Sequence, residues 1–266
     1  MPRSLIATGA GFLVLGLFWG AWAAVLPGVQ EATGASKGTL GLALLCVGLG
    51  AIPAMLLLAG PLVDRYGTRA VSVACAAFAL VVLLPGLTGS VQTLAGALLL
   101  TGAASGTLDV GINTRAAQLE DETGRRLMPA AHGLYSVGVL VGAGTAGLAR
   151  GEGIGREWIL AAVAASVGLA ALAFLADPPC VRGTARRVRP RFERALLALG
   201  LVAAAAFVVE GGVESWSALF LERQLGAERR SAAWARRCSA ARWRSAASAA
   251  SSPDVSATAG SSRAAR

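Results

Sequence analysis

Acidic side chains inside apolar segments are the residues of this sequence best suited to chemistry. Asp109 lies near the end of a long uncharged run, and Asn113 follows it four residues later. Residues four apart share one face of a helix. A carboxylate in a membrane helix is costly and tends to face the bundle interior or an aqueous cavity. The pair is therefore a candidate site for a proton or a substrate hydrogen bond. The alternative is that both residues lie at a helix end, where Asp109 pairs with Arg115 or with loop backbone.

Glu210 and Glu214 form a second pair with the same spacing, in a later apolar segment. Glu210 follows fifteen uncharged residues, so we expect it to lie deeper than Glu214. A buried carboxyl group is suited to reversible proton uptake, and Glu210 is a candidate for coupling or gating. The alternative is that Glu210 is an interfacial acid near the outer end of its helix. Glu214 lies nearer the surface, where we expect it to be solvated.

Aromatic and imidazole side chains offer fewer possibilities. Trp19 could stack on a sugar or apolar solute beside a cavity, although Trp is also a common interfacial anchor. Trp22 precedes Pro27, which we interpret as the end of its helix, and so Trp22 fits such an anchor. His132 is the only histidine, and we expect it to form a helix-end hydrogen bond. Neither it nor the four cysteines have metal or redox spacing, so we expect no metal, no cofactor and no enzymatic activity.

The segments that carry these residues are long enough to cross a membrane. The sequence is 55% hydrophobic and 15% charged, whereas soluble domains carry about 25% charged residues. A membrane helix needs about 20 mostly apolar residues. Seven segments meet this requirement: 5–26, 38–61, two within 70–113 that are separated by a turn at 85–90, 127–149, 158–176 and 195–221. Pairs of glycines four residues apart predict close helix packing at Gly16/Gly20, Gly102/Gly106 and Gly138/Gly142.

Basic residues are distributed unevenly between alternate loops. With a cytoplasmic N-terminus, the three outer loops carry three basic residues, Lys37, Arg150 and Arg156. The cytoplasmic segments then carry twelve: Arg3, Arg65, Arg69, Arg115, Arg125, Arg126, Arg182, Arg186, Arg187, Arg189, Arg191 and Arg194. This asymmetry follows the positive-inside rule. It predicts a multi-pass protein of the cell inner membrane with its N-terminus in the cytoplasm.

The charge and the prolines divide the chain into four regions. Residues 1–177 form a six-helix transmembrane bundle, and 178–194 an Arg-rich cytoplasmic linker. Residues 195–226 hold the seventh helix. In the tail at 227–266 the residues are mostly Ala, Ser and Arg, and we expect disorder there. Residues 228–266 hold eight arginines against Glu228 and Asp254. The net charge of +9 is therefore mostly a property of the tail, and it does not indicate nucleic-acid binding.

The segment between the second and third helices carries the most specific motif. It reads G-P-L-V-D-R-Y-G-T-R and resembles the signature loop of the major facilitator superfamily, which runs roughly G-x-L-a-D-r-x-G-r-[KR]. The matching residues are Gly60, Leu62, Asp64, Arg65, Gly67 and Arg69, while Thr68 departs from the usual basic residue. Three further stretches, 106–113, 132–138 and 210–221, resemble the sugar:proton symporter and bacterial inner-membrane permease branch. For the segment at 60–69, the alternative is an ordinary Asp-Arg loop with a glycine turn.

The resemblance implies what this loop would do. In the family it forms a charge relay at the cytoplasmic surface that latches the inward-closed state. By position, Asp64 would pair with a cation or cap a helix N-terminus, where a carboxylate is favoured. Gly67 would permit the tight turn.

Taken together, these patterns predict an all-α membrane protein: the N-terminal six-helix half of a major facilitator fold plus a seventh helix. The resemblance implies proton-coupled transport of a small solute by alternating access, with the lipid bilayer, the solute and a proton as partners. The family also leads us to expect five more helices after residue 221. The alternative is therefore a truncated, non-transporting remnant or a membrane assembly partner. A frameshift near residues 226–228 would explain the tail, and translation of the other two DNA frames tests that idea.

Overall fold

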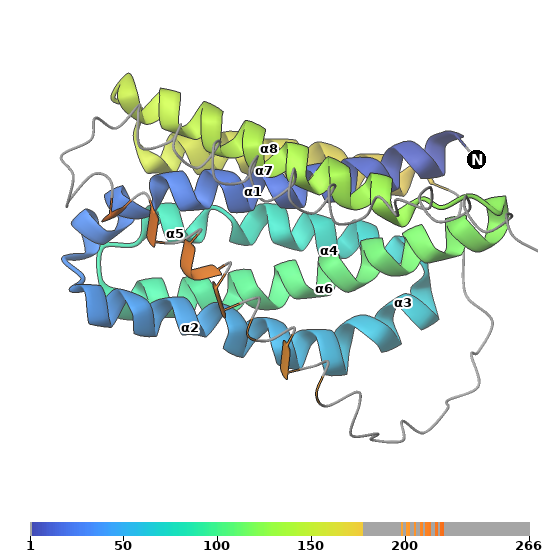
Figure 1. Ribbon diagram of the computed structural model, residues 1–266, viewed down its shortest axis with the longest axis horizontal. Coiled ribbons are helices and arrows are strands. Elements are labelled where there is room, and N and C mark those ends of the chain that lie inside the picture. The colour runs from blue at the N-terminus through green and yellow to red at the C-terminus, as the bar shows by residue number, and fades with distance from the viewer. Residues whose placement is uncertain are drawn as a thin grey trace, which may run out of the picture.

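The computed structural model describes residues 2–177 and scattered positions between 198 and 220, and every element within them is helical. Long helices run side by side along the long axis of the molecule (Figure 1). Their bounds are α1 Pro2–Thr33, α2 Lys37–Pro53, the π-helix η1 Ala54–Ala59, α3 Gly60–Tyr66, α4 Thr68–Val81, α5 Leu84–Leu87, α6 Val91–Thr123, α7 Met128–Gly151 and α8 Arg156–Leu175. The described positions between 198 and 220 are helical as well, in agreement with a seventh membrane helix.

The predicted membrane segments correspond to these helices. Five helical segments of the described chain are long and apolar enough to cross a membrane: 3–33, 37–66, 68–87, 91–123 and 156–175. Helix α7 spans 24 residues at the position of the predicted fifth segment, but it is not among the five. The linker at 178–194 and the tail at 227–266 lie outside the described residues.

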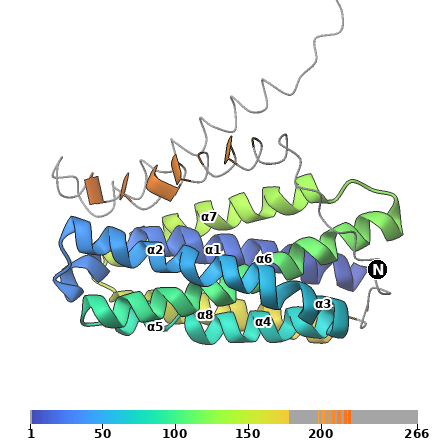
Figure 2. The same cartoon turned by 90° about the horizontal axis from the view of Figure 1, so that it is seen from below.

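Helices that are distant in the sequence form the main packing interfaces. Helix α1 packs against α7 and α8, α6 packs against α2 and α4, and α4 packs against α8 (Figure 2). Phe18 of α1 meets Phe78 of α4 edge to face, with ring centroids 5.1 Å apart. Trp22 is only 2% exposed and stacks with Phe18. The expectation that Trp22 is an interfacial anchor is therefore wrong, because its ring lies inside the core.

Glycines allow two helix pairs to approach until their backbones touch. A Cβ on Gly16 of α1 would lie 2.0 Å from the carbonyl oxygen of Tyr135 in α7. A Cβ on Gly102 of α6 would lie 2.0 Å from the carbonyl oxygen of Val47 in α2. Gly20, Gly138 and Gly142 make equally close approaches. The predicted close packing is confirmed, and it joins α1 to α7 and α2 to α6.

The first helix does not end at Pro27, as the sequence had suggested. Helix α1 continues to Thr33, and Gly34 follows it with φ +62°. Proline lacks an N–H and disturbs the hydrogen bonds of the preceding turn. In this bundle, Arg150 of α7 donates to the carbonyl oxygen of Ala24 at 2.7 Å. The acceptor that Pro27 leaves without its helical partner is the carbonyl oxygen of Ala23, one residue earlier, so the Arg150 contact ties the proline turn to α7 and does not replace the missing bond.

The signature segment is mostly helical and not a loop. Helical structure continues from α2 through η1 and α3 to Tyr66, past Gly60 and Pro61. Only Gly67 separates α3 from α4, and its φ of +56° with ψ of −134° is a conformation that favours glycine. The change to i→i+5 hydrogen bonding in η1, which ends at Ala59, comes just before Pro61 and alters which N–H each carbonyl oxygen meets there. A proline in this place does not end the segment.

The fourth membrane segment is longer than the sequence suggested. Helix α6 begins after a capping box formed by Ser90 and Thr93 and ends at Gly124, which has φ +65°. Its predicted end near Asn113 is therefore ten residues too early. Asp109 lies fourteen residues before the end of α6, which is about 21 Å along the helix axis. The Pro85-Gly86 turn signal is likewise displaced: these residues belong to α5, and the connection is at 88–90.

One end of the bundle holds the N-terminus, the α3–α4 turn, the α6–α7 connection and the end of α8 (Figure 1). We call it the arginine-rich end, because it carries Arg3, Arg65, Arg69, Arg115, Arg125 and Arg126. At the opposite end, Arg156 donates to the carbonyl oxygens of Gly86 and Thr88 at 2.9 and 3.2 Å. At this end Arg150 therefore links α7 to α1, and Arg156 links the start of α8 to the connection between α5 and α6.

Candidate functional site

Asp109 and Asn113 lie together on α6, on a partly exposed face. The amide of Asn113 donates to the Asp109 carboxylate at 3.1 Å and to the Asp109 carbonyl oxygen at 2.9 Å. Both side chains are half-buried, whereas Thr101 and Ser105, earlier on the helix, are buried. Asp109 makes no ion pair with Arg115, which instead bonds Asp177 and Glu122. The pairing that the sequence left open for Asp109 is therefore with Asn113.

His132 of α7 completes a small cluster with these residues. It lies close enough to Asp109 for the two charges to interact. Its ring packs against Phe12 of α1, with centroids 5.3 Å apart. Its Nδ1 donates to the carbonyl oxygen of Met128 at 3.0 Å, as predicted for a helix-end histidine. Because Nδ1 is occupied, Nε2 is the ring nitrogen available to a further partner.

The connection between α6 and α7 fixes the relative position of Asp109 and His132. The carboxylate of Glu120 accepts hydrogen bonds from the backbone N–H groups of Leu127 and Met128, the latter at 2.9 Å. These N–H groups lie at the start of α7, where a carboxylate is favoured. The sequence contains no spacing signal for the Asp109–His132 neighbourhood, because it depends on how two antiparallel helices align.

Trp19 lies on α1, seven residues after Phe12. Seven residues are about two helical turns, or roughly 10 Å, so the two aromatic rings share a face of α1. Trp19 is half-buried and meets Phe18 edge to face, with centroids 4.9 Å apart. The indole ring thus has one part in the core and one part accessible. This arrangement permits contact with a solute but does not require it.

A buried ionic cluster, which the sequence did not reveal, lies at the arginine-rich end. Arg115 is 4% exposed, and its Nε donates to Asp177 at 3.3 Å. Its Nη1 donates to Glu122 at 3.0 Å. The hydroxyl of Ser4 donates to the other oxygen of Asp177. The cluster joins α1, α6 and Asp177, the second residue after the end of α8. From the sequence alone, Asp177 marked only the end of a helix, because two prolines follow it.

The residues of the signature segment lie at the same end, but on its surface. Asp64, Arg65 and Arg69 are exposed. The Arg65 guanidinium lies 5.4 Å from the centre of the Tyr66 ring. Within residues 2–177, none of the three takes part in an ion pair. Gly60 is an ordinary helical residue, while Gly67 forms the turn between α3 and α4.

Two of the sequence-predicted site residues, Glu210 and Glu214, lie outside the described residues. In the part of the chain that is described, no group of three or more His, Cys, Asp or Glu side chains could hold a metal ion. The described site is therefore a carboxylate–amide–imidazole cluster on the bundle face, together with an ionic cluster and an exposed basic segment at one end.

Comparison with known proteins places these features in a family. The family model of the Major Facilitator Superfamily matches residues 8–246. An uncharacterized MFS-type transporter of Yersinia pestis is 35% identical over 227 residues, which cover 81% of this chain and 57% of that protein. An uncharacterized transporter of Sinorhizobium fredii is 31% identical over 231 residues, covering 84% of this chain and 60% of the relative.

Two further comparisons extend this result. The membrane protein MosC of Rhizobium meliloti is 30% identical over 226 residues, covering 83% of this chain and 54% of MosC. The crystal structure of the nucleoside transporter NupG superposes with a TM-score of 0.60 at 17% identity, over 82% of this chain and 54% of that one. The superposition on NupG shows that the two chains have the same fold. The chain spans about half the length of the curated relatives that it matches, and it belongs to the major facilitator superfamily.

Proposed function

We propose that this chain takes part in proton-coupled transport of a small solute by alternating access, in a cell inner membrane with its N-terminus in the cytoplasm. The observation that carries the proposal is the position of Asp109. It is a half-buried carboxylate inside a membrane-length helix, held by Asn113 and close to His132. Acidic residues in such positions mark substrate or proton pathways.

Asp109, Asn113 and His132 would each have a different role in proton transfer. Asp109 would accept a proton when its side of the bundle faces the proton source and release it after the conformational change. Asn113 would hold the carboxylate in one orientation through its 3.1 Å hydrogen bond. His132, on the neighbouring helix α7, would contribute a second polar group next to this carboxylate. Trp19 and Phe12 would supply the apolar wall beside them.

Alternating access needs two halves that move against each other around a shared site. The described part of this chain supplies five helical segments long and apolar enough to cross a membrane, together with the 24-residue α7, and the chain spans 57%, 60% and 54% of the three relatives. Glu210 and Glu214 belong to the proposal as candidate residues on the seventh helix. The alternative that the sequence left open is the second candidate function: a membrane protein that assembles with a partner and does not itself transport.

Replacing Asp109 with asparagine is expected to abolish solute-driven proton movement, because the amide cannot take up and release a proton. The chain would be reconstituted into vesicles that enclose a pH-sensitive dye, and solutes of several classes would be added outside. For a solute that acidifies the wild-type vesicles, the signal of Asp109→Asn should fall to that of protein-free vesicles. Asp121→Asn makes the same chemical change at an exposed position of the same helix and should leave the signal intact.

Two results would count against this reading. An unchanged signal in Asp109→Asn would remove Asp109 from the proton pathway. If no solute moves protons in wild-type vesicles, and a pull-down of the folded chain recovers a stable membrane partner, the second candidate function replaces the first.

The orientation can be tested by cysteine labelling. Arg125 lies at the arginine-rich end and Lys37 at the opposite end, and both are exposed. In a chain whose four cysteines are replaced by serine, Arg125→Cys should react with a membrane-impermeant maleimide only in inverted vesicles. Lys37→Cys should react only in right-side-out vesicles. The reverse pattern would place the N-terminus outside the cell.

A further inference from the structure

A lateral groove lies between α3, α4 and α6, and none of the Asp109, Asn113 and His132 side chains lines it. Its volume is about 740 Å³. It is lined mainly by small and aliphatic side chains, among them Val73, Ala77 and Leu80 of α4 and Leu100 of α6. Val73 and Leu80 are 68% and 71% exposed. The groove is therefore open along its side, where a membrane protein meets lipid tails.

The groove runs along the helices and is apolar for most of its length. Its lining residues on α4 and α5 extend from Arg69 to Leu84, which is about 22 Å at 1.5 Å per residue. That length approaches the ~30 Å of a bilayer's hydrocarbon core. The hydroxyl of Thr107 donates to the carbonyl oxygen of Ala103 at 2.8 Å and so needs no partner in the groove. An extended hydrocarbon chain matches this surface in both length and polarity.

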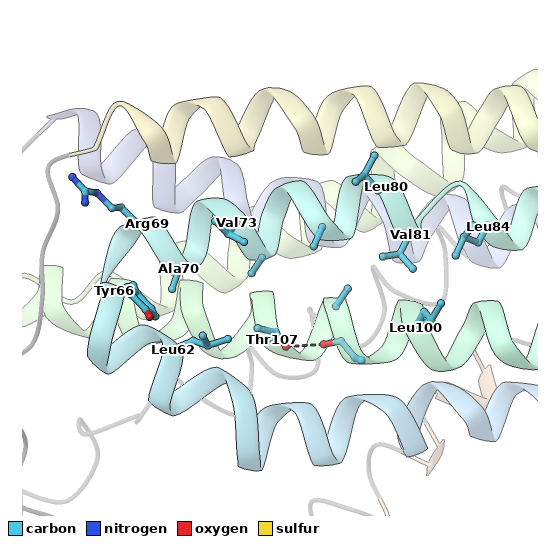
Figure 3. Close-up of a pocket in the computed structure, with 14 residues that line it drawn as sticks. Leu62, Tyr66, Arg69, Ala70, Val73, Leu80, Val81, Leu84, Leu100 and Thr107 are labelled. Carbon is cyan, nitrogen blue, oxygen red and sulfur yellow. Dashed lines mark hydrogen bonds between the residues drawn. The ribbon is translucent and has the colours of Figure 1, made fainter.

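The end of the groove at the arginine-rich end of the bundle is polar and positively charged. Tyr66 and Arg69 line it there, and Arg65 lies over the Tyr66 ring at 5.4 Å. Figure 3 shows Tyr66 and Arg69 at the same end of the groove, with the Arg69 guanidinium directed outward from the apolar wall. Both arginines are exposed, and within residues 2–177 neither forms an ion pair. Two guanidinium groups next to one carboxylate, Asp64, leave a net positive charge at this end.

We propose that the groove binds a phospholipid with an anionic headgroup, its acyl chain along α4 and its phosphate held by Arg65 and Arg69. Guanidinium groups bind phosphate with two parallel hydrogen bonds, and basic pockets between membrane helices recognise anionic headgroups. The apolar groove alone would accept any lipid tail. The arginines at its end select the headgroup.

The test measures lipid binding and requires no transport. The chain is purified in mild detergent, stripped of lipid, and titrated by native mass spectrometry with phosphatidylglycerol or phosphatidylethanolamine of the same acyl chains. The wild-type chain should prefer phosphatidylglycerol by about thirtyfold, at about 1 kcal/mol for each of the two arginines near the headgroup. In the double variant R65Q/R69Q that preference should disappear. R125Q/R126Q removes two arginines at the same end that do not line the groove, and it should keep the preference.

A second pair of variants tests the acyl-chain part of the site. Ala77 and Ala76 are neighbouring exposed residues of α4, but only Ala77 lines the groove. Because both face outward, a tryptophan should be tolerated at either position. Ala77→Trp should reduce binding of both lipids at least several-fold, while Ala76→Trp should bind like the wild type. Equal binding of the two headgroups by the wild type, a preference that survives R65Q/R69Q, or equal behaviour of the two tryptophan variants would each overturn the proposal.

Discussion

Replacing Gly138 with alanine is expected to cause one of the largest stability losses available in the described bundle. A Cβ there would lie 2.1 Å from the carbonyl oxygen of Leu13 and 2.9 Å from the amide nitrogen of Leu17. Both atoms belong to the backbone of α1 and cannot rotate away. The helices would have to separate along an interface that also contains Gly16, Gly20 and Gly142. Overpacking of this kind typically costs 1–3 kcal/mol, and we expect about 3 kcal/mol here because the clash is with backbone.

Gly133 provides the matched control on the same helix. A Cβ at Gly133 would meet nothing within 4 Å, and alanine favours helix over glycine by about 1 kcal/mol. Thermal unfolding of the detergent-purified variants would compare the two. Gly138→Ala should melt about 10 °C below the wild type for a loss of this size, whereas Gly133→Ala should melt at or above it. Equal melting temperatures would show that α1 and α7 are not in backbone contact in the folded protein.

The same comparison can be repeated on the second interface. A Cβ on Gly102 of α6 would lie 2.0 Å from a backbone oxygen of α2, while one on Gly96 of α6 would meet nothing within 4 Å. The four-residue spacing in the sequence singled out Gly102 and Gly138, which each have a glycine four residues later, and not Gly96 or Gly133. The sequence did not show which helix each of these glycines would touch, because that depends on how the helices pair.

The sequence predicted the order of the membrane helices correctly, and it predicted which helix ends lie at the same end of the bundle. Apolar runs of about 20 residues are strong signals, and the segments in 5–176 all correspond to helices. It was a poorer guide to their ends. Pro27 and Pro61 read as helix stops, yet α1 and the α2–α3 segment pass through both. A change of helical register precedes Pro61, and a hydrogen bond from Arg150 to the Ala24 carbonyl ties the turn around Pro27 to α7.

Helix length was underestimated where polar residues begin. Helix α6 continues ten residues beyond Asn113, because Arg115 and Gln118 are buried against other helices. A pattern that equates polar residues with loops cannot anticipate such burial. Asp109 was identified correctly as a residue on the same helix face as Asn113, but its neighbour His132 was not. That neighbour comes from another helix, and its position is a consequence of tertiary packing.

The second large effect is expected at Asp177. This carboxylate has no exposed surface in its side chain, and it accepts hydrogen bonds from Arg115 and Ser4. In Asp177→Ala, the buried Arg115 would keep only Glu122, whose side chain is 41% exposed. Removing one partner of a buried ion pair commonly costs 3–5 kcal/mol, because the remaining charge is left uncompensated. Because Arg115 would keep its contact with Glu122, we expect a loss of stability at the lower end of this range, about 3 kcal/mol.

A double-variant cycle separates the loss of the pair from the loss of packing. If the cost arises from an uncompensated charge, Arg115→Met and Asp177→Leu should each destabilise strongly. Their combination should then recover much of the loss, because no buried charge remains. Melting temperatures of the four proteins give the coupling energy, and Arg125→Met, at an exposed position, should change stability by little. Strictly additive losses would mean that Arg115 and Asp177 act independently. Non-additive losses would show that one ion pair ties the end of α8 to α6 and, through Ser4, to α1.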